Sequence, residues 1–173
     1  MEIRKLSRKD YAGKKFKLVY KTNGHYAVEP AENGFLMEYS PFEHEKEMTF
    51  TDEFFAEWLD DPVEYGVFEG DKLLGFAEGT LERWNNRYRI SNICIFDESD
   101  RRKGYGKALI GKMLEKAKEH GARMVVLETQ SCNEKAIAFY RSLGFSVIGF
   151  DLYAYSNDDP EKNEVRIEMG MKL

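Results

Sequence analysis

A basic, glycine-rich loop between a strand and a long amphipathic helix is the feature that most constrains this fold. The loop reads Arg101-Arg102-Lys103-Gly104-Tyr105-Gly106-Lys107 and follows an apolar, strand-like run that ends near Phe96. From about residue 105 to 120, apolar side chains recur every three to four positions, as they do on one face of a helix. A strand, a tight loop and a helix in this order are typical of an α/β domain.

The composition of this loop predicts an anion-binding site. A helix N-terminus presents unpaired N–H groups and the positive end of the helix dipole. Gly104 and Gly106 would let backbone amides approach phosphate oxygens closely. The positive side chains of the loop are Arg101, Arg102, Lys103 and Lys107. Because there is no Gly-Lys-Ser/Thr sequence and no full dinucleotide fingerprint, we expect a pyrophosphate cradle of another kind.

The remaining segments predict one α/β domain over residues 1–173, without repeats or linkers. Strands are expected at residues 2–7, 64–68, 72–81, 88–96, 124–129, 146–155 and 165–171, and a second helix at 134–143. Thr51, followed by acidic residues, predicts another helix that ends before Pro62. Residues 11–48 contain several turn signals, so we expect loops there with short helical or extended pieces.

Composition indicates a folded cytoplasmic protein. Hydrophobic residues make up 42% of the 173 positions and charged residues 33%, and no apolar run is long enough to span a bilayer. The start of the chain lacks the apolar stretch of a secretory signal. With only Cys94 and Cys132, and three scattered histidines, neither a disulfide framework nor a metal site is expected. We also expect no nucleic-acid or membrane partner.

Charge is distributed unevenly along the chain. Residues 1–21 carry eight Lys and Arg against two Asp and Glu, whereas residues 22–100 carry five against nineteen. Residues 101–173 carry thirteen against ten. This asymmetry favours two ligands of opposite sign, one anionic and one cationic, although an uneven solvated surface has the same composition.

The loop and a second motif resemble the GCN5-related N-acetyltransferase (GNAT) superfamily. The acetyl-coenzyme A loop of that family reads Gln/Arg-x-x-Gly-x-Gly/Ala, which Arg101-x-x-Gly104-x-Gly106 matches. The second motif is Asn133-x-x-Ala136-x-x-Phe139-Tyr140-x-x-x-Gly144-Phe145. The resemblance covers residues 64–173 and implies a mixed, mostly antiparallel central sheet of about six to seven strands flanked by about four helices.

A narrower resemblance is to the bacterial streptothricin acetyltransferases, which inactivate an antibiotic by acetylating an amine of its β-lysine moiety. The segments that carry it are Trp84-Asn85-Asn86-Arg87-Tyr88, Leu127-Glu128-Thr129-Gln130 with Asn133, and Gly149-Phe150-Asp151-x-x-Tyr153. It implies antibiotic resistance through acetylation of a small, cationic amine, and it leaves a homodimer open.

The family resemblance implies direct acetyl transfer from acetyl-coenzyme A to a primary amine in a ternary complex. The loop would bind the pyrophosphate, and the backbone of Ile93, Cys94 and Ile95 would bind the pantetheine arm. Asn133 would hydrogen-bond the same arm, although an Asn there is also a good helix N-cap. Tyr140 would be the general acid, because a phenol with a pKa near ~10 is protonated at neutral pH. Tyr140 would equally suit the apolar face of its helix.

The general base is not assigned by any motif. Ser91 and Asn92 stand where relatives often carry carboxylates, and neither removes a proton at neutral pH. The alternatives are Glu78 or Glu82 on the preceding strand, Glu128 on the next one, or a relay through ordered water. A carboxylate at Glu78 or Glu128 could instead bind the ammonium group of the acceptor, or have a structural role.

Three functional hypotheses therefore stay open. The first is a small-molecule N-acetyltransferase, of the streptothricin or an aminoglycoside-like type. The second is a peptide or protein N-acetyltransferase, and the third is a non-catalytic acyl-coenzyme A-binding module. Turnover with a panel of amines would distinguish the third from the other two.

Overall fold

Five successive strands separate the first short helix from the first long one, and the computed structural model describes residues 1–173. The elements are β1 (Glu2–Lys5), α1 (Arg8–Tyr11), β2 (Lys15–Ala31), β3 (Gly34–Glu53), β4 (Val63–Glu69), β5 (Lys72–Glu82), β6 (Arg87–Ile95), the 3₁₀ turn η1 (Glu98–Asp100), α2 (Tyr105–Glu119), β7 (Met124–Gln130), α3 (Glu134–Ser142), β8 (Ser146–Asp151), α4 (Asp159–Lys162) and β9 (Arg166–Lys172). No helix is long and apolar enough to cross a bilayer.

Seven strands form the main sheet, in the order β1-β4-β5-β6-β7-β9-β8, and β2 and β3 form a separate two-stranded sheet. The pairs β1–β4, β4–β5, β5–β6 and β8–β9 are antiparallel. The predicted α/β fold with a mixed, mostly antiparallel sheet is thus confirmed.

The chain folds as two compact units. The first comprises residues 1–20, 49–126 and 172–173, and the second comprises residues 21–48 and 127–171. Strands β2, β3, β7 and β9 contribute residues to both units. The assignment of residues 1–173 to one acetyltransferase domain stays a prediction.

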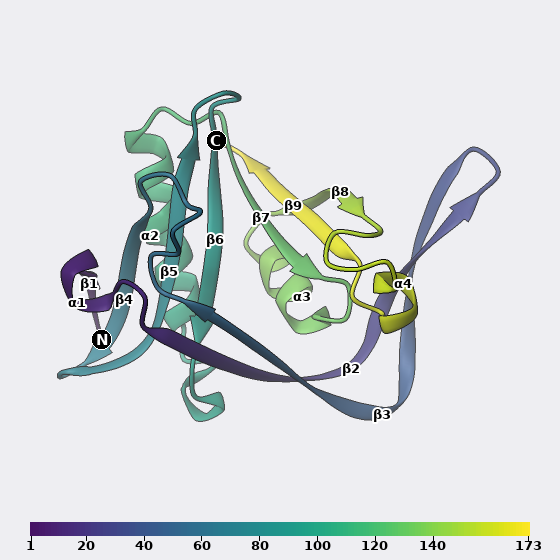
Figure 1. Ribbon diagram of the computed structural model, residues 1–173, viewed down its shortest axis with the longest axis horizontal. Helices are drawn as coiled ribbons and strands as arrows, with labels where there is room; N and C mark the ends of the chain where they lie inside the picture. The colour runs from purple at the N-terminus through teal and green to yellow at the C-terminus, as the bar shows by residue number, and fades with distance from the viewer. The chain divides into compact units, whose positions relative to one another are not determined.

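In the first unit, helix α2 packs on strands β4, β5 and β6 (Figure 1). Its buried positions are Leu109, Ile110, Met113 and Ala117, which confirms the predicted apolar face. The helix ends at Glu119, just before Gly121, whose φ of 65° lies in the left-handed region that a glycine adopts without strain.

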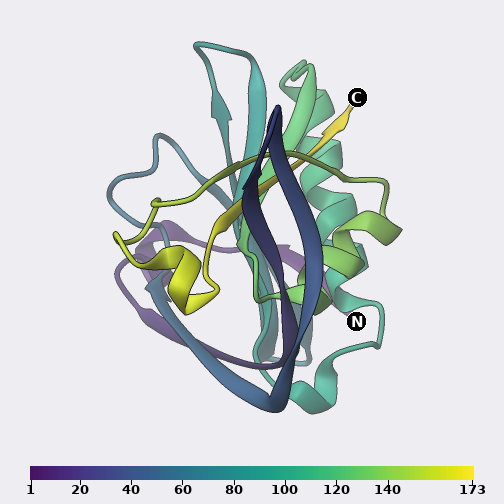
Figure 2. The ribbon, with the colours of Figure 1, turned by 90° about the vertical axis from the view of Figure 1, so that its right-hand side faces the viewer.

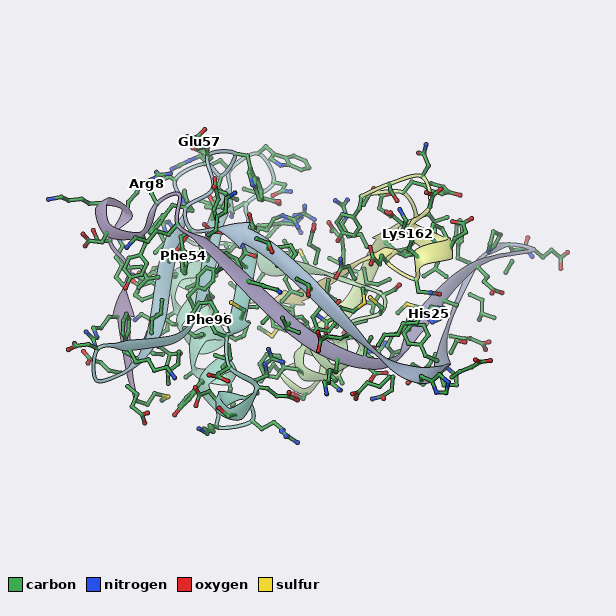
Figure 3. The ribbon with its side chains drawn as sticks, turned by 60° about the horizontal axis from the view of Figure 1, so that its bottom comes forward. Arg8, His25, Phe54, Glu57, Phe96 and Lys162 are labelled. Atoms are coloured by element: carbon green, nitrogen blue, oxygen red, sulfur yellow. The ribbon has the colours of Figure 1, made fainter.

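Aromatic side chains fill the core of this unit. Phe54 lies 4.4 Å from Phe76 and 5.3 Å from Phe16, measured between ring centroids. Phe96, which follows β6, packs against the same cluster, and Figure 3 shows Phe54 and Phe96 among these side chains. Tilted and edge-to-face contacts of this kind stabilise a core beyond the burial of apolar area alone.

The helix predicted from Thr51 is absent. Strand β3 continues to Glu53, and the chain then turns irregularly, with left-handed backbone at Phe55 and Asp61. Phe54, Phe55 and Leu59 are buried as expected, but Trp58 is 71% exposed. The acid-rich start resembles a helix cap, yet residues 51–53 stay in β3 and Phe55 has a φ of 54°, which a right-handed helix does not contain.

The loops predicted for residues 11–48 are also absent, because this segment forms most of β2 and β3. The two strands twist together up to a turn at residues 32–33 (Figure 2). Asn23-Gly24, which we interpreted as a turn, lies within β2. A Cβ at Gly24 would meet the Tyr39 hydroxyl and the Ser40 carbonyl oxygen at 2.5 Å, so the glycine serves close strand pairing.

In the second unit, residues 21–48 are attached to helix α3. The Tyr39 hydroxyl donates to Glu134 Oε2 at 2.7 Å, and the backbone N–H of Asn23 donates to Glu134 Oε1 at 3.0 Å. Strand β8 ends at Asp151, earlier than predicted, and the following polar segment contains the short helix α4.

Candidate active site

The predicted phosphate loop lies between β6 and α2, as expected. Gly104 is the N-cap of α2, with a φ of 88°, and a Cβ at this position would meet no atom within 4 Å. Arg102 also has left-handed backbone, with a φ of 63°. Left-handed residues next to right-handed ones can turn successive backbone N–H groups toward one concave anion site.

The first intrahelical bond of α2 joins the N–H of Ala108 to the carbonyl of Gly104 at 3.0 Å. The N–H groups of Tyr105, Gly106 and Lys107 therefore precede the helical ladder and have no partner within the helix. Together with the open space over Gly104, these donors fit a phosphate group.

The four cations of the loop have different environments. The Arg101 guanidinium donates to the carbonyls of Val19 at 2.7 Å and Ile95 at 3.2 Å, so it fastens the loop to its neighbours in the first unit. Lys103 donates to Asp100 at 2.7 Å, and this bond raises the pKa of Lys103. Arg102 and Lys107 are exposed and form no ion pair within the structure. These two side chains are therefore the cations best suited to a phosphate.

Ile93, Cys94 and Ile95 form the last part of β6, paired with β5 through Ala77, Phe76 and Gly75. Burial raises the pKa of the Cys94 thiol to about 12, so this thiol is protonated and unreactive at neutral pH. Cys132 is also buried. Both side chains therefore behave as core residues.

Glu78 belongs to a set of polar side chains at paired positions on adjacent strands. Glu64 on β4 stands opposite Glu78 on β5, which stands opposite Asn92 on β6. Asn92 Nδ2 lies 3.1 Å from both Glu78 Oε2 and Asp52 Oδ2, and donates to each. We call Asp52, Glu64, Glu78 and Asn92 the carboxyl row. Glu64 and Glu78 are fully buried, whereas Asp52 is partly exposed.

Burial dominates the acid–base behaviour of the row. Burial, followed by the hydrogen bond and the charge of the neighbouring Glu78, raises the pKa of Glu64 to about 9. Burial also raises the pKa of Glu78, while hydrogen bonds from Glu64 and Asn92 oppose that rise. Glu64 is therefore the neutral acid of the pair, and Glu78 the carboxylate.

Glu82 is poorly placed to act as a base. Burial alone would raise its pKa, but its hydrogen bonds with Arg89, Asn85 and Arg87 lower the pKa below the usual value. The contacts with Arg89 and Arg87 measure 2.6 and 2.9 Å. Glu78, the other candidate of strand β5, is fully buried.

The second unit holds Glu128, Asn133 and Tyr140. Glu128 forms an ion pair with Arg166 at 3.7 Å. Asn133 caps α3, because its side chain accepts from the N–H of Ala136 at 3.3 Å; this leaves the amide Nδ2 as a donor. Tyr140 is buried at 7% exposure and its ring packs near Phe145, at 6.1 Å between centroids.

The carboxyl row is the part of this site that sequence reasoning missed. Glu64 and Asp52 were not identified, and Asn92 was considered only as an absent base. Counting the register from the hairpin turn at Gly70-Asp71 places Glu64 opposite Ala77, and only the register shift between Val67 and Phe68 brings it opposite Glu78. The bulge that leaves Ser91 unpaired beside this row was not readable from the sequence.

Comparison with known proteins shows one family. Residues 31–145 match the acetyltransferase (GNAT) family. The chain is 30% identical to streptothricin acetyltransferase A of Bacillus subtilis (strain 168) over 131 residues, covering 70% of this chain and 75% of that protein. It is 36% identical to a Streptomyces lavendulae streptothricin acetyltransferase over 93 residues, covering 54% of this chain and 48%, about half, of that protein.

Solved structures agree with this family in fold. A nourseothricin acetyltransferase superposes with a TM-score of 0.78 at 25% identity, covering 99% of this chain and 97% of that one. A Bacillus anthracis (strain Ames) protein assigned as a streptothricin acetyltransferase, solved with acetyl coenzyme A, has a TM-score of 0.72 at 24% identity. That alignment also covers 99% of this chain and 97% of the other, and it includes residues 11–48, where the sequence pattern alone failed.

Proposed function

This chain belongs to the acetyltransferase (GNAT) family, and on that premise we propose that it acetylates a primary amine of a small, cationic, streptothricin-type acceptor with acetyl coenzyme A as donor. The observation that carries the proposal is the 30% identity to streptothricin acetyltransferase A over 70% of the chain. We further propose that residues 1–173 act as one acetyltransferase domain and that the reaction takes place in the cytoplasm.

Backbone groups would make most of the contacts with acetyl coenzyme A. The amides at the start of α2 and the open space over Gly104 suit the pyrophosphate, with Arg102 and Lys107 adding charge. The last residues of β6, Ile93–Ile95, would bind the pantetheine arm through their main chain. Acetyl coenzyme A supplies the acetyl group as a thioester, which an amine attacks directly.

Transfer would require a neutral amine and a proton for the leaving thiolate. As the C–N bond forms and the C–S bond breaks, the Tyr140 hydroxyl would give its proton to the thiolate sulfur. The proton lost by the amine nitrogen would pass to a carboxylate or to water. Glu78 and Glu128 are the candidate carboxylates, and Glu128 must share its charge with Arg166.

The direct test is release of coenzyme A thiol from acetyl coenzyme A, with streptothricin, spermidine, an aminoglycoside and a basic peptide offered separately. We expect release with streptothricin. Release with the basic peptide alone would favour a peptide N-acetyltransferase instead. Tight donor binding without release for any amine would leave an acyl-coenzyme A-binding module and would contradict the proposed function.

Replacement of Tyr140 by Phe tests the general acid. Because only the transferable proton is lost, kcat should fall by well over tenfold, within the ~10²–10⁴-fold range of general acid catalysis. The affinity for acetyl coenzyme A should stay nearly unchanged. Phe139→Leu, next to it on α3, is the matched control for packing, and an unaltered rate in Tyr140→Phe would remove Tyr140 from this role.

A further inference from the structure

The carboxyl row contains two glutamates that cannot both be charged. Glu64 and Glu78 are directly paired across β4 and β5, and side chains at such positions are separated by only ~4.5–5.5 Å between Cβ atoms. Both are fully buried. Two carboxylates this close in a buried site repel strongly, so the pair holds one proton and one negative charge.

The hydrogen bonds of the two carboxyl groups limit where this proton can lie. Glu64 Oε1 accepts from the backbone N–H of Phe55, and Glu78 Oε2 accepts from Asn92. Glu64 Oε2 and Glu78 Oε1 remain, and neither meets any other donor. A proton on Glu64 Oε2, donated to Glu78 Oε1, satisfies both atoms at once.

The charged and titratable groups that face the pair come from three elements. Arg8 of α1, labelled in Figure 3, acts on Glu64 and favours its ionised form. Asp52 of β3 acts on Glu78 and disfavours ionisation. The Cys94 thiol of β6 is neutral, because burial raises its pKa to about 12. The buried part of the row therefore keeps its negative charge on Glu78.

Asn92 connects this buried charge to the surface. Its Nδ2 donates to Glu78 Oε2 and to Asp52 Oδ2, so the amide holds the Asp52 carboxylate in place from the buried end of the row. Asp52 is the partly exposed end of the row. Asn92 directly precedes Ile93, where the proposed pantetheine-binding segment begins, and lies beside the bulge at Ser91. Bulges next to active sites commonly re-aim strand residues toward a ligand.

We infer that Asp52 binds the ammonium group of the acceptor, and that Glu64, Glu78 and Asn92 are positioning residues that hold it there. The inference rests on the proposed function, because it assigns the acceptor side of that reaction. An ammonium group has three donors and one positive charge, and a carboxylate held from behind by an amide offers it a charge-assisted hydrogen bond.

Asp52→Asn tests the binding role, since it keeps the shape of the side chain and removes the charge. The KM for streptothricin should rise at least tenfold, and the KM for acetyl coenzyme A should stay within twofold. Glu57→Gln is the matched control, because Glu57 is an exposed acid of the next turn outside the row. An unchanged acceptor KM in Asp52→Asn, or an equal rise in Glu57→Gln, would overturn the inference.

Glu64 tests the positioning role through a conservative pair of variants. Gln at position 64 can accept from Phe55 and donate to Glu78, whereas Leu can do neither. We expect Glu64→Leu to raise the acceptor KM at least fivefold and Glu64→Gln to restore most of this loss. If Glu64→Leu does not fold, Asn92→Leu takes its place, because it removes the bridge to Asp52. Wild-type KM in both leucine variants would contradict the positioning role.

Calorimetric titration of streptothricin into the wild-type protein and Asp52→Asn separates this inference from the proposed reaction. Binding that weakens at least tenfold in Asp52→Asn, without turnover in the wild type, would support the Asp52 site and contradict acetyl transfer. Turnover in the wild type together with equal streptothricin binding in both proteins would support acetyl transfer and contradict the Asp52 site. Absence of streptothricin binding to the wild type would overturn both.

Discussion

The phosphate loop and the carboxyl row are both parts of the first unit. They are suited to ligands of opposite charge and use different kinds of groups to bind them. The loop uses backbone N–H groups, which only a proline substitution removes, around the empty space of Gly104. The row uses buried side chains on three paired strands, each of which has one specific hydrogen-bonding task. A backbone site tolerates changes of its side chains, whereas a side-chain site depends on every member.

Glu64→Leu should show the largest effect. It removes the proton donor of Glu78 and the acceptor of the Phe55 N–H, so two buried polar groups lose a partner. The free energy of unfolding should fall by roughly 3 kcal/mol, and by less than about 1 kcal/mol in Glu64→Gln. Urea denaturation of both variants measures the difference. Equal values would mean that the shared proton contributes nothing to stability.

The dependence of stability on pH is the next test of the row. The pKa of Glu64 is about 9 in the folded protein, above its ordinary value of 4.5. Between these values the folded chain keeps a proton that the unfolded chain releases, so stability falls as pH rises. One such proton corresponds to about 1.4 kcal/mol per pH unit.

Denaturation series from pH 6 to 9 on the wild type and on Glu64→Gln would isolate this contribution, because every other titrating group is common to both. The wild type should lose stability more steeply with increasing pH than the variant. Parallel curves would show that Glu64 has an ordinary pKa.

Substitution of Gly104 should show the smallest effect of the three; it acts on donor binding and adds backbone strain, because side chains rarely adopt the φ of 88° found there. Val would fill the open space over the loop, raising the KM for acetyl coenzyme A roughly tenfold, or ~1.4 kcal/mol. Gly104→Asn separates space from strain, because Asn tolerates the left-handed backbone. Gly111→Ala, within α2, is the control. Normal donor affinity in Gly104→Val would contradict the phosphate site.

The two sites also differed in how well the sequence predicted them. The loop is contiguous in the sequence, so its glycines, its cations and the helix that follows could be recognised as one motif. The row draws Glu64, Glu78 and Asn92 from three strands, and only the register of two strand pairs brings them side by side. Asp52 was missed for another reason: its segment was predicted as a helix, whereas it is the end of a strand.

Local signals also failed where tertiary packing decides the structure. Asn23-Gly24 is a strong turn pair, but Gly24 pairs closely with Tyr39 and Ser40 instead of starting a turn. Conversely, α2, α3 and the β4–β5 hairpin were predicted within a few residues, because caps, periodicity and turn residues all agreed there. Agreement among independent local signals is therefore the better guide to a correct element.

The burial of both cysteines has a practical consequence for labelling chemistry. Maleimides and disulfide reagents attack thiolates that solvent can reach, and Cys94, with a thiol pKa of about 12, offers almost none. A single cysteine placed at the exposed turn residue Asn33 would therefore be the preferred target for a dye. The native cysteines should therefore add little signal when a fluorescent dye is attached. A thiol reagent added during turnover would detect the released coenzyme A with little contribution from the protein.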